Sequence, residues 1–234
     1  MLVKGGDEMV AAALDPCMKV SPCKALMGRL SYMGFVREEA TDRLARLSPT
    51  FTSRQAREEG LSWRDLYALR DSEEIAELAR GVYRKASAPE TAHVDLLAVA
   101  ARVPQAVICL ESALALHDLT DEVPSEIRIA VPRNRHVPRF DYPPLSVSRF
   151  DPHTFEVGVE LFEIAPGEMI RVYSAARSVV DAIRLRRFVG EVTGLRALRL
   201  YVRRRGAQPA ELLRLARLLR AEGRVRSALD AVTA

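Results

Sequence analysis

Lysine, cysteine and histidine are scarce in this sequence. Of its 35 basic residues only four are lysines, and none of these lies beyond Lys85. A phosphate-binding P-loop is excluded, because no Gly-Lys-Ser/Thr sequence occurs. Nucleases that pair an acidic residue with a nearby lysine are disfavoured, because no lysine lies beyond residue 85. Three cysteines are too few for a disulfide scaffold, and their odd number favours a reducing compartment.

Long apolar runs are also missing. No stretch approaches the ~18 apolar residues that span a bilayer, so we expect neither a membrane helix nor a membrane partner. Residues 9–14 are apolar, but they follow two acidic residues, Asp7 and Glu8, and are too short for a signal-peptide core. These features favour a cytoplasmic protein.

The remaining composition is that of a globular chain with unevenly distributed charge. The 234 residues are 48% hydrophobic and 28% charged, which fits one or two folded domains. Residues 171–234 hold 15 arginines against five acidic residues, a balance of +10, whereas the whole chain carries +4. This basic region favours an anionic partner, either nucleic acid or an acidic protein surface. A solvated arginine-rich face would explain it equally well.

Residues 36–86 have the pattern of a winged helix-turn-helix. Three short helices are predicted, and the last two begin at capping boxes: Thr52 with Gln55, and Ser62 with Asp65. A hairpin follows them, and three helices followed by a hairpin is the order of this motif. The expected bounds are 38–47, 52–60 and 62–70 for the helices and 78–84 for the hairpin.

The third of these helices is predicted to read DNA. At about 100° per residue its aromatic and basic side chains share one face, while Leu66 and Leu69 face the body of the domain. Arginine can bond guanine bidentately, and aromatic residues bond phosphates or stack on sugars. The alternative is that one or both aromatic residues belong to the core. The exposed face would consist of Trp63, Arg64, Tyr67 and Arg70.

Further contacts are expected with DNA phosphates. In a winged motif the hairpin lies beside the neighbouring groove, and basic residues on the preceding helix can also reach the backbone. Residues 37–86 nevertheless hold ten basic and ten acidic residues, and Glu73, Glu74 and Glu77 precede the wing. Tight binding by this module alone is therefore not expected. The predicted phosphate contacts are Arg54, Arg80, Arg84 and Lys85, with Arg57 as a further candidate.

After a linker at residues 87–90, the pattern of residues 91–234 predicts a second domain of mixed α/β type. The fold class is therefore α+β, an N-terminal winged helix-turn-helix followed by a mixed α/β C-terminal domain. Residues 1–35 are interpreted as an extension of unknown role. The expected helices are 93–102, 111–116, 175–186, 192–204 and 209–222, and the expected strands are 106–109, 126–131, 145–149, 159–164 and 169–173.

The arginines near the C-terminus lie in stripes beside leucines on the last two predicted helices. One interpretation is an amphipathic helix with a solvated basic face. The other is a surface for DNA backbone or for an acidic protein. The stripes consist of Arg196, Arg199 and Arg203 on one helix and of Arg217, Arg220 and Arg224 on the next.

Support for catalysis is weak. The four histidines form neither a His-x-x-x-His pair nor a short cluster with cysteine, and no Gly-x-Ser-x-Gly elbow occurs. We therefore expect no enzyme, no cofactor and no metal. A nucleic-acid enzyme guided by the winged helix is the alternative, and it would require Glu111, His117 and Asp118 to converge.

Six segments, taken in their order and spacing, are similar to a known family. They are residues 51–60 (FTSRQAREEG), 61–67 (LSWRDLY), 78–84 (LARGVYR), 111–119 (ESALALHDL), 124–132 (PSEIRIAVP) and 173–181 (YSAARSVVD). Over about residues 36–230 the chain resembles AbiEi-type antitoxins of the AbiE, or type IV, toxin–antitoxin and abortive-infection systems.

The resemblance implies a function for each domain. The winged helix would bind operator DNA and repress its own operon, with the helix from Ser62 to Arg70 and the wing around Arg80-Gly81 in the DNA-reading positions. The second domain would counter a nucleotidyltransferase-like toxin encoded by the neighbouring gene. The alternative is a stand-alone winged-helix regulator whose second domain senses a ligand or a partner.

Overall fold

The computed structural model describes residues 39–233. The expected N-terminal extension, residues 1–35, lies outside the described residues. Residues 43–234 form one compact unit, so the winged module from residue 43 onward and the second domain belong to the same body. Within residues 39–233, no helix combines the length and the apolar character that crossing a bilayer requires.

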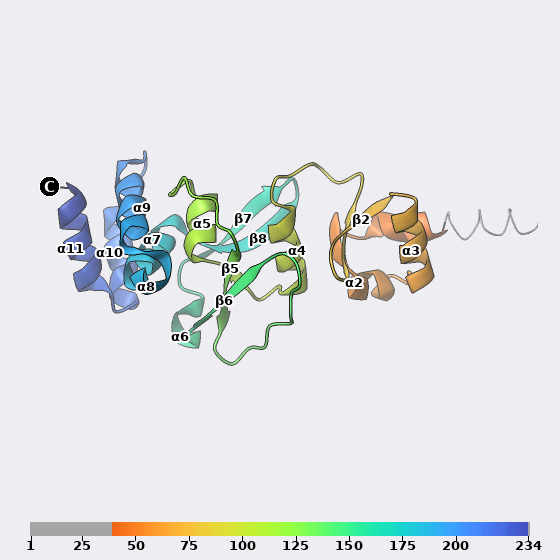
Figure 1. Ribbon diagram of the computed structural model, residues 1–234, viewed down its shortest axis with the longest axis horizontal. Coiled ribbons are helices and arrows are strands. Elements are labelled where there is room, and N and C mark those ends of the chain that lie inside the picture. The colour runs from red at the N-terminus through yellow and green to blue at the C-terminus, as the bar shows by residue number, and fades with distance from the viewer. Residues whose placement is uncertain (1–38, 234) are drawn as a thin grey trace, which may run out of the picture. The chain divides into compact units, whose positions relative to one another are not determined.

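The first part of the described chain has the predicted winged helix-turn-helix order (Figure 1). A helix of residues 39–46 precedes one short strand, two helices and the hairpin. The sequence pattern does not predict the short strand, which is held by Phe51 packing on Tyr83 with ring centroids 5.9 Å apart. Together the strands form an antiparallel sheet of order β1-β3-β2. The elements are β1 (Thr50–Thr52), α2 (Ser53–Glu58), α3 (Trp63–Asp71), β2 (Ile75–Ala79) and β3 (Val82–Lys85).

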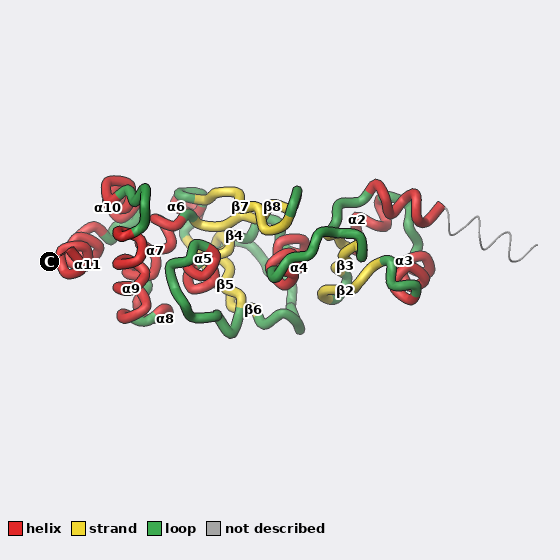
Figure 2. The backbone as a smooth tube through the Cα atoms, turned by 90° about the horizontal axis from the view of Figure 1, so that it is seen from above, coloured by secondary structure: helices red, strands yellow, loops and turns green. Residues whose placement is uncertain are grey.

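The second domain is built on a five-stranded mixed sheet of order β6-β5-β4-β8-β7 (Figures 1 and 2). The outer pair β7–β8 is antiparallel and the pair β5–β6 is parallel. The short central β4 runs antiparallel to β5 and parallel to β8. All five predicted strands form. They are β4 (Val107–Ile108), β5 (Ile127–Pro132), β6 (Leu145–Phe150), β7 (Val159–Ala165) and β8 (Glu168–Tyr173).

The helices of the second domain follow the prediction with four differences. The predicted helix 175–186 breaks at Leu185, the predicted helix 209–222 ends at Leu218, and the last helix and a short one after β6 are not predicted. The described helices of this domain are α4 (Val94–Arg102), α5 (Leu110–Leu116), α6 (Pro152–Phe155), α7 (Ala175–Arg184), α8 (Arg186–Val189), α9 (Glu191–Arg203), α10 (Pro209–Leu218) and α11 (Glu222–Thr233).

Alternate residues of the central strands contribute to two separate cores, as the pleat of a sheet requires. Ile129 and Val172 belong to a core with the apolar residues of α4. Their neighbours Ala130 and Tyr173 belong to a second core with α5, α7, α9, α10 and α11. The central strands are therefore covered by apolar residues on both faces.

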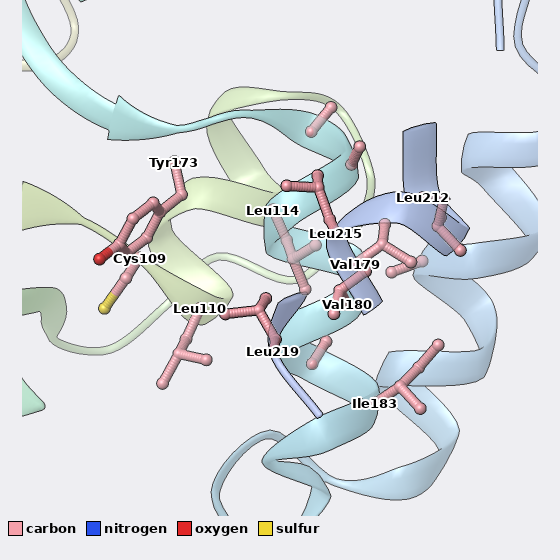
Figure 3. Packing of buried hydrophobic residues seen from close by; sticks show 14 of the residues in the cluster. Cys109, Leu110, Leu114, Tyr173, Val179, Val180, Ile183, Leu212, Leu215 and Leu219 are labelled. Carbon is pink, nitrogen blue, oxygen red and sulfur yellow. The ribbon is translucent and has the colours of Figure 1, made fainter. Parts of the chain in front are cut away.

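The larger core joins the helices that follow the sheet. Leu110 and Leu114 of α5 face the buried side of α7, and α10 contributes Leu212, Leu215 and Leu219 from its buried face and its C-terminal cap (Figure 3). All five leucines are buried. Burial of apolar surface contributes about 25 cal/mol per Å², so this packing stabilises the helical part.

Helix α4 also packs against the winged module. Its Ala98 is fully buried and contacts Ala79 of β2 and Val82 of β3. Leu97 and Val99, which flank Ala98 in α4, belong to the core on the five-stranded sheet. One helix thus carries apolar contacts to both sheets, and this joins the winged module to the second domain.

Candidate nucleic-acid interface

Helix α3 begins at a complete capping box. The Asp65 N–H donates to Ser62 Oγ at 3.1 Å, and the Ser62 N–H donates to Asp65 Oδ2 at 2.8 Å. Leu61 and Leu66, at the two positions of a hydrophobic staple, are both buried. Ser62 therefore fixes where the helix starts, and with it the direction in which the first helical side chains point.

The aromatic residues of α3 face solvent. Trp63 is 47% exposed and Tyr67 is 52% exposed, whereas Leu66 and Leu69 are buried. The alternative that either aromatic residue belongs to the core is therefore wrong. Arg64 is exposed beside them, and within the described residues its side chain has no hydrogen bond or ion pair.

Arginines lie over both exposed rings. The guanidinium carbon of Arg57 is 5.8 Å from the centroid of Trp63, and that of Arg70 is 5.1 Å from the centroid of Tyr67. Arg70 also forms ion pairs with Asp71 at 3.3 Å and Glu77 at 3.8 Å. These contacts hold Arg70 over the helix face, and it must leave the two carboxylates to bond a base.

The wing, the β2–β3 hairpin, is fixed by hydrogen bonds at its tip. Gly81 has φ +73°, and its N–H donates to Glu77 Oε1 at 3.0 Å. The Gly81 carbonyl accepts from the Ser53 N–H at 2.9 Å, which ties the tip to the start of α2. The Arg102 guanidinium of α4 donates to the Arg80 carbonyl, so the Arg80 side chain projects from an anchored backbone.

The face of α3, the start of α2 and the wing border one groove of about 850 Å³. The groove is lined by basic and acidic side chains. Arg54 forms an ion pair with Glu58 at 2.8 Å, and Glu77 is also part of the lining. The Glu58 carboxylate raises the pKa of Arg54 through a hydrogen bond and its charge. The groove brings together five predicted residues: Arg54, Trp63, Tyr67, Arg70 and Arg80.

Arg84 is not a phosphate contact, which corrects the sequence-based prediction. Its side chain is only 8% exposed and forms an ion pair with Glu168 of β8. It also donates to Thr50 Oγ1 and to the Pro89 carbonyl, both at 2.6 Å. All of these acceptors belong to the protein itself, so this arginine joins the winged sheet to the second domain.

Lys85 is likewise used inside the fold. Its Nζ donates to the carbonyl oxygens of Leu47, at 2.6 Å, and Ala45, at 3.1 Å. These carbonyls lie at the C-terminal end of the helix of residues 39–46, where a cation is favourable. Burial lowers the pKa of the Lys85 ammonium group. Contact with phosphate would require this lysine to give up its bonds to the helix end.

The predicted arginines of α9 are all exposed. Arg196 forms an ion pair with Asp121. Arg199 and Arg203 have no hydrogen bond or ion pair from their side chains to any residue between 39 and 233. The α9 stripe therefore offers two unpaired cations and one that is already paired.

The second predicted stripe is not a single helical stripe. Helix α10 ends at Leu218, and Arg220 lies in the turn with φ +55°. Arg217 is paired with Glu222 at 2.9 Å, and Arg224 of α11 donates to the Arg184 carbonyl at 3.0 Å. The prediction of one continuous helix was wrong because the chain turns here.

The residues considered for catalysis each have other partners or face solvent. Glu111 Oε2 lies 3.0 Å from Arg128 Nε, the His117 Nε2 atom is 2.8 Å from the Tyr173 carbonyl oxygen, and Asp118 is exposed. No hydrogen bond or ion pair joins any two of the three. Among the described residues, no group of three or more His, Cys, Asp and Glu side chains is placed to hold a metal ion.

Sequence reasoning misses Arg102 as a residue of this groove. The only signal is a basic residue in the last turn of an apolar helix, which is common because a cation there offsets the helix dipole. Nothing local indicates that its guanidinium reaches the Arg80 and Arg139 carbonyls, or that it lies 5.0 Å from the Phe140 ring.

Comparison with known proteins agrees with the winged module. Residues 39–84, about a fifth of the chain, match the family model described as transcriptional regulator, AbiEi antitoxin. No curated protein sequence gives a significant match. The matched segment includes α2, α3 and the wing up to Arg84. Residues 39–84 are therefore similar to the AbiEi antitoxin family of transcriptional regulators, and their winged helix-turn-helix fold agrees with that match.

Proposed function

We propose that this chain is the antitoxin of a type IV toxin–antitoxin system and also binds operator DNA to repress its own operon. The observation that carries the proposal is the exposed aromatic and basic face of α3, on a capped helix within an AbiEi-family module. In helix-turn-helix proteins the second helix lies in the major groove with its first residues at the base edges. Trp63 and Arg64 are the first two residues of α3.

The groove residues Arg54, Trp63, Tyr67, Arg70 and Arg80 each have a role in this proposal, and so does the neighbouring exposed Arg64 of α3. Arg64 and Arg70 bond base edges, where a bidentate arginine recognises guanine. Tyr67 and Trp63 pack on the sugar–phosphate backbone, and Arg54 and Arg80 contact phosphates. Because Arg54 is paired with Glu58 and Arg70 with Glu77, these two arginines exchange a carboxylate for a nucleic-acid acceptor on binding. The exchange lowers affinity and leaves base recognition intact.

The experiment is a binding titration of the full chain with the DNA upstream of its own gene. We predict that Arg70→Ala weakens specific binding by about 1 to 3 kcal/mol and relaxes base preference at one position. Arg214→Ala is the matched control, because Arg214 is also an exposed arginine paired with a carboxylate. Unchanged affinity and preference in Arg70→Ala would remove this residue from the interface.

The antitoxin role is assigned to the second domain, residues 91–234. We propose that its partner is a nucleotidyltransferase-like toxin encoded by the adjacent gene and that both act in the cytoplasm. Co-expression with that gene product should restore growth, and the Arg70→Ala variant should protect as well as the unmodified chain. Failure of both to protect would favour a stand-alone regulator.

We further propose that the chain acts by binding and not by catalysis. The alternative of a nucleic-acid enzyme requires Glu111, His117 and Asp118 to converge. Glu111 is instead paired with Arg128, and His117 is bonded to the Tyr173 carbonyl. These separate contacts are the observation that argues against the enzyme alternative.

A further inference from the structure

The second domain contains a second groove, and this one is basic. Its lining residues lie far along the chain from the winged module. It has a volume of about 760 Å³, within the range of small-molecule sites. One wall is β6, an edge strand of the five-stranded sheet. The other walls are the junction of α7 and α8 and the turn between α10 and α11, elements that Figure 1 labels.

Three arginines of this groove have no carboxylate partner within residues 39–233. Arg133 and Arg220 have unbonded guanidinium groups, and Arg149 donates only to the carbonyls of Arg133, at 3.4 Å, and Arg135, at 2.7 Å. The lining carries one carboxylate, Asp151. The groove therefore has an excess of positive charge.

Two further arginines of the lining are already neutralised. Arg128 lies 3.0 Å from Glu111, and Arg184 forms two hydrogen bonds with buried Asp181, at 2.7 and 3.1 Å. They fix the walls of the groove and leave the unpaired arginines to meet a ligand.

Arg220 occupies a backbone conformation that favours glycine. It follows the cap of α10 with φ +55°, and the Ala221 N–H donates to the Ala216 carbonyl at 2.8 Å, as in a Schellman turn. Glycine is the residue most often found at this position, because it has no Cβ. An arginine here is strained, and the strain is consistent with a role for its side chain.

An exposed aromatic ring lies beside these cations. Phe188 of α8 is 64% exposed and lines the same groove. Ser146 of β6 adds a hydroxyl group that is not hydrogen-bonded to any described residue. The groove thus offers guanidinium groups, a hydroxyl and a planar apolar surface together.

We propose that this groove binds a nucleoside phosphate, either free or as a unit of a nucleic-acid strand. Guanidinium groups of Arg133, Arg149 and Arg220 hold the phosphate, because their planar fork matches its oxygens. Phe188 stacks on the base, as aromatic residues do in single-strand binding sites. A terminal phosphate brings about two negative charges in one small group, so a free nucleotide matches this confined excess of charge better than single carboxylates of a peptide. The phosphodiester of a strand brings one charge per unit.

The site is separate from the proposed operator interface. None of its lining residues belongs to the winged module. Arg220 is also one of the C-terminal arginines predicted to contact the DNA backbone, but that prediction depends only on its charge. Operator binding and nucleotide binding can therefore be measured independently on the same variants, and each proposal can fail without the other.

The test is calorimetric titration of the full chain with ATP, pyrophosphate, adenosine, a single-stranded tetranucleotide and an acidic peptide. Arg220→Gly is the informative variant, because it removes the guanidinium group and relieves the backbone strain. We expect it to bind ATP about tenfold more weakly while melting at the same or a higher temperature. Phe188→Ala should weaken ATP binding and leave pyrophosphate binding unchanged. Arg205→Gln, an exposed arginine outside the groove, is the control.

The titrations with ATP and with the tetranucleotide distinguish a free nucleotide from a nucleic-acid strand as the ligand. Tighter binding of ATP than of the tetranucleotide assigns the site to a free nucleotide, and the reverse order assigns it to a strand. The proposal is overturned if neither binds, if Arg220→Gly and Phe188→Ala bind ATP as the unmodified chain does, or if an acidic peptide binds as tightly as ATP.

Discussion

A buried arginine needs an acceptor for each of its donors, and Arg84 has acceptors from three separate segments. They are Thr50 in β1, Pro89 in the linker and Glu168 in β8. Taking an ion out of water costs several kcal/mol, so the ion pair is favourable only while all partners remain. Arg84 therefore couples the winged sheet to the second domain at the level of one side chain.

We predict that Glu168→Gln lowers the free energy of unfolding by roughly 3 kcal/mol. The amide keeps the size and one acceptor of the side chain but leaves Arg84 as an uncompensated buried charge. Denaturant titration of the full chain measures the loss. Glu122→Gln, at an exposed carboxylate, is the control and should change little.

The double variant Arg84→Leu/Glu168→Leu distinguishes charge from packing. It removes both ions, so it should lose less stability than Glu168→Gln alone. An equal or larger loss in the double variant would mean that packing, and not the buried charge, accounts for the effect.

At the scale of elements, side chains near helix ends decide where the helices begin and stop. Thr52 and Ser62 cap α2 and α3 with their own side chains, and both starts are predicted from sequence. The end of α10 has no such signal, because the position after its cap is held by Arg220 in place of the usual glycine. Glu222 then starts α11 and pairs with Arg217 and Arg226, both at 2.9 Å.

The α10–α11 turn should respond to acid. Hydrogen bonds from Arg217 and Arg226 lower the pKa of Glu222 from 4.5 to about 2. A carboxyl group with a lowered pKa in the folded state stabilises the fold above pH 4.5, and this contribution is lost as pH falls towards 2. Because the group is exposed, the effect is small. Glu222→Gln should melt slightly lower than the unmodified chain at pH 7 and equally near pH 2, as differential scanning calorimetry can measure.

An equal deficit of the Glu222→Gln variant at pH 7 and pH 2 would contradict this expectation. It would show that the substitution acts through the packing of α11 and not through the charge of Glu222. Glu191→Gln is a useful comparison, since Glu191 is also in the first turn of a helix and pairs with Arg186 at the longer distance of 3.6 Å.

At the scale of the whole molecule, charge is concentrated away from the proposed reading helix. Residues 37–86 hold equal numbers of acidic and basic residues, and residues 171–234 carry +10. In the described structure many arginines of this C-terminal region form ion pairs with carboxylates, whereas Arg199 and Arg203 on α9 form none. If the chain binds operator DNA, we expect α9 to add phosphate contacts to those of Arg54 and Arg80.

We predict that replacing Arg196, Arg199 and Arg203 together by Ala flattens the slope of log K against log salt for operator binding by about two to three units. Each phosphate contact contributes about 0.9 to this slope on duplex DNA. Base preference should survive, because phosphate contacts carry no sequence information. Titrations of both full-length chains at several salt concentrations test this, and equal slopes would place the three arginines outside the interface.

Much of the candidate interface could be predicted because it depends on neighbours within about four positions. The capped start of α3 and the division between its exposed and buried faces follow from helical periodicity. The sequence alone does not decide whether Trp63 and Tyr67 face solvent or the core, since an aromatic residue suits both environments. The packing of Leu66 and Leu69 in the folded module settles that question.

The sequence by itself determined the winged helix-turn-helix, the five strands of the second sheet and the basic character of the C-terminal region. These depend on local periodicity, capping and composition. Only the tertiary structure decided that Arg84 is buried against Glu168, 84 positions away, and that Arg133 and Arg220 line one groove. An arginine has the same charge and reach in any sequence. Whether it meets solvent, a phosphate or a carboxylate depends on which distant segments fold beside it.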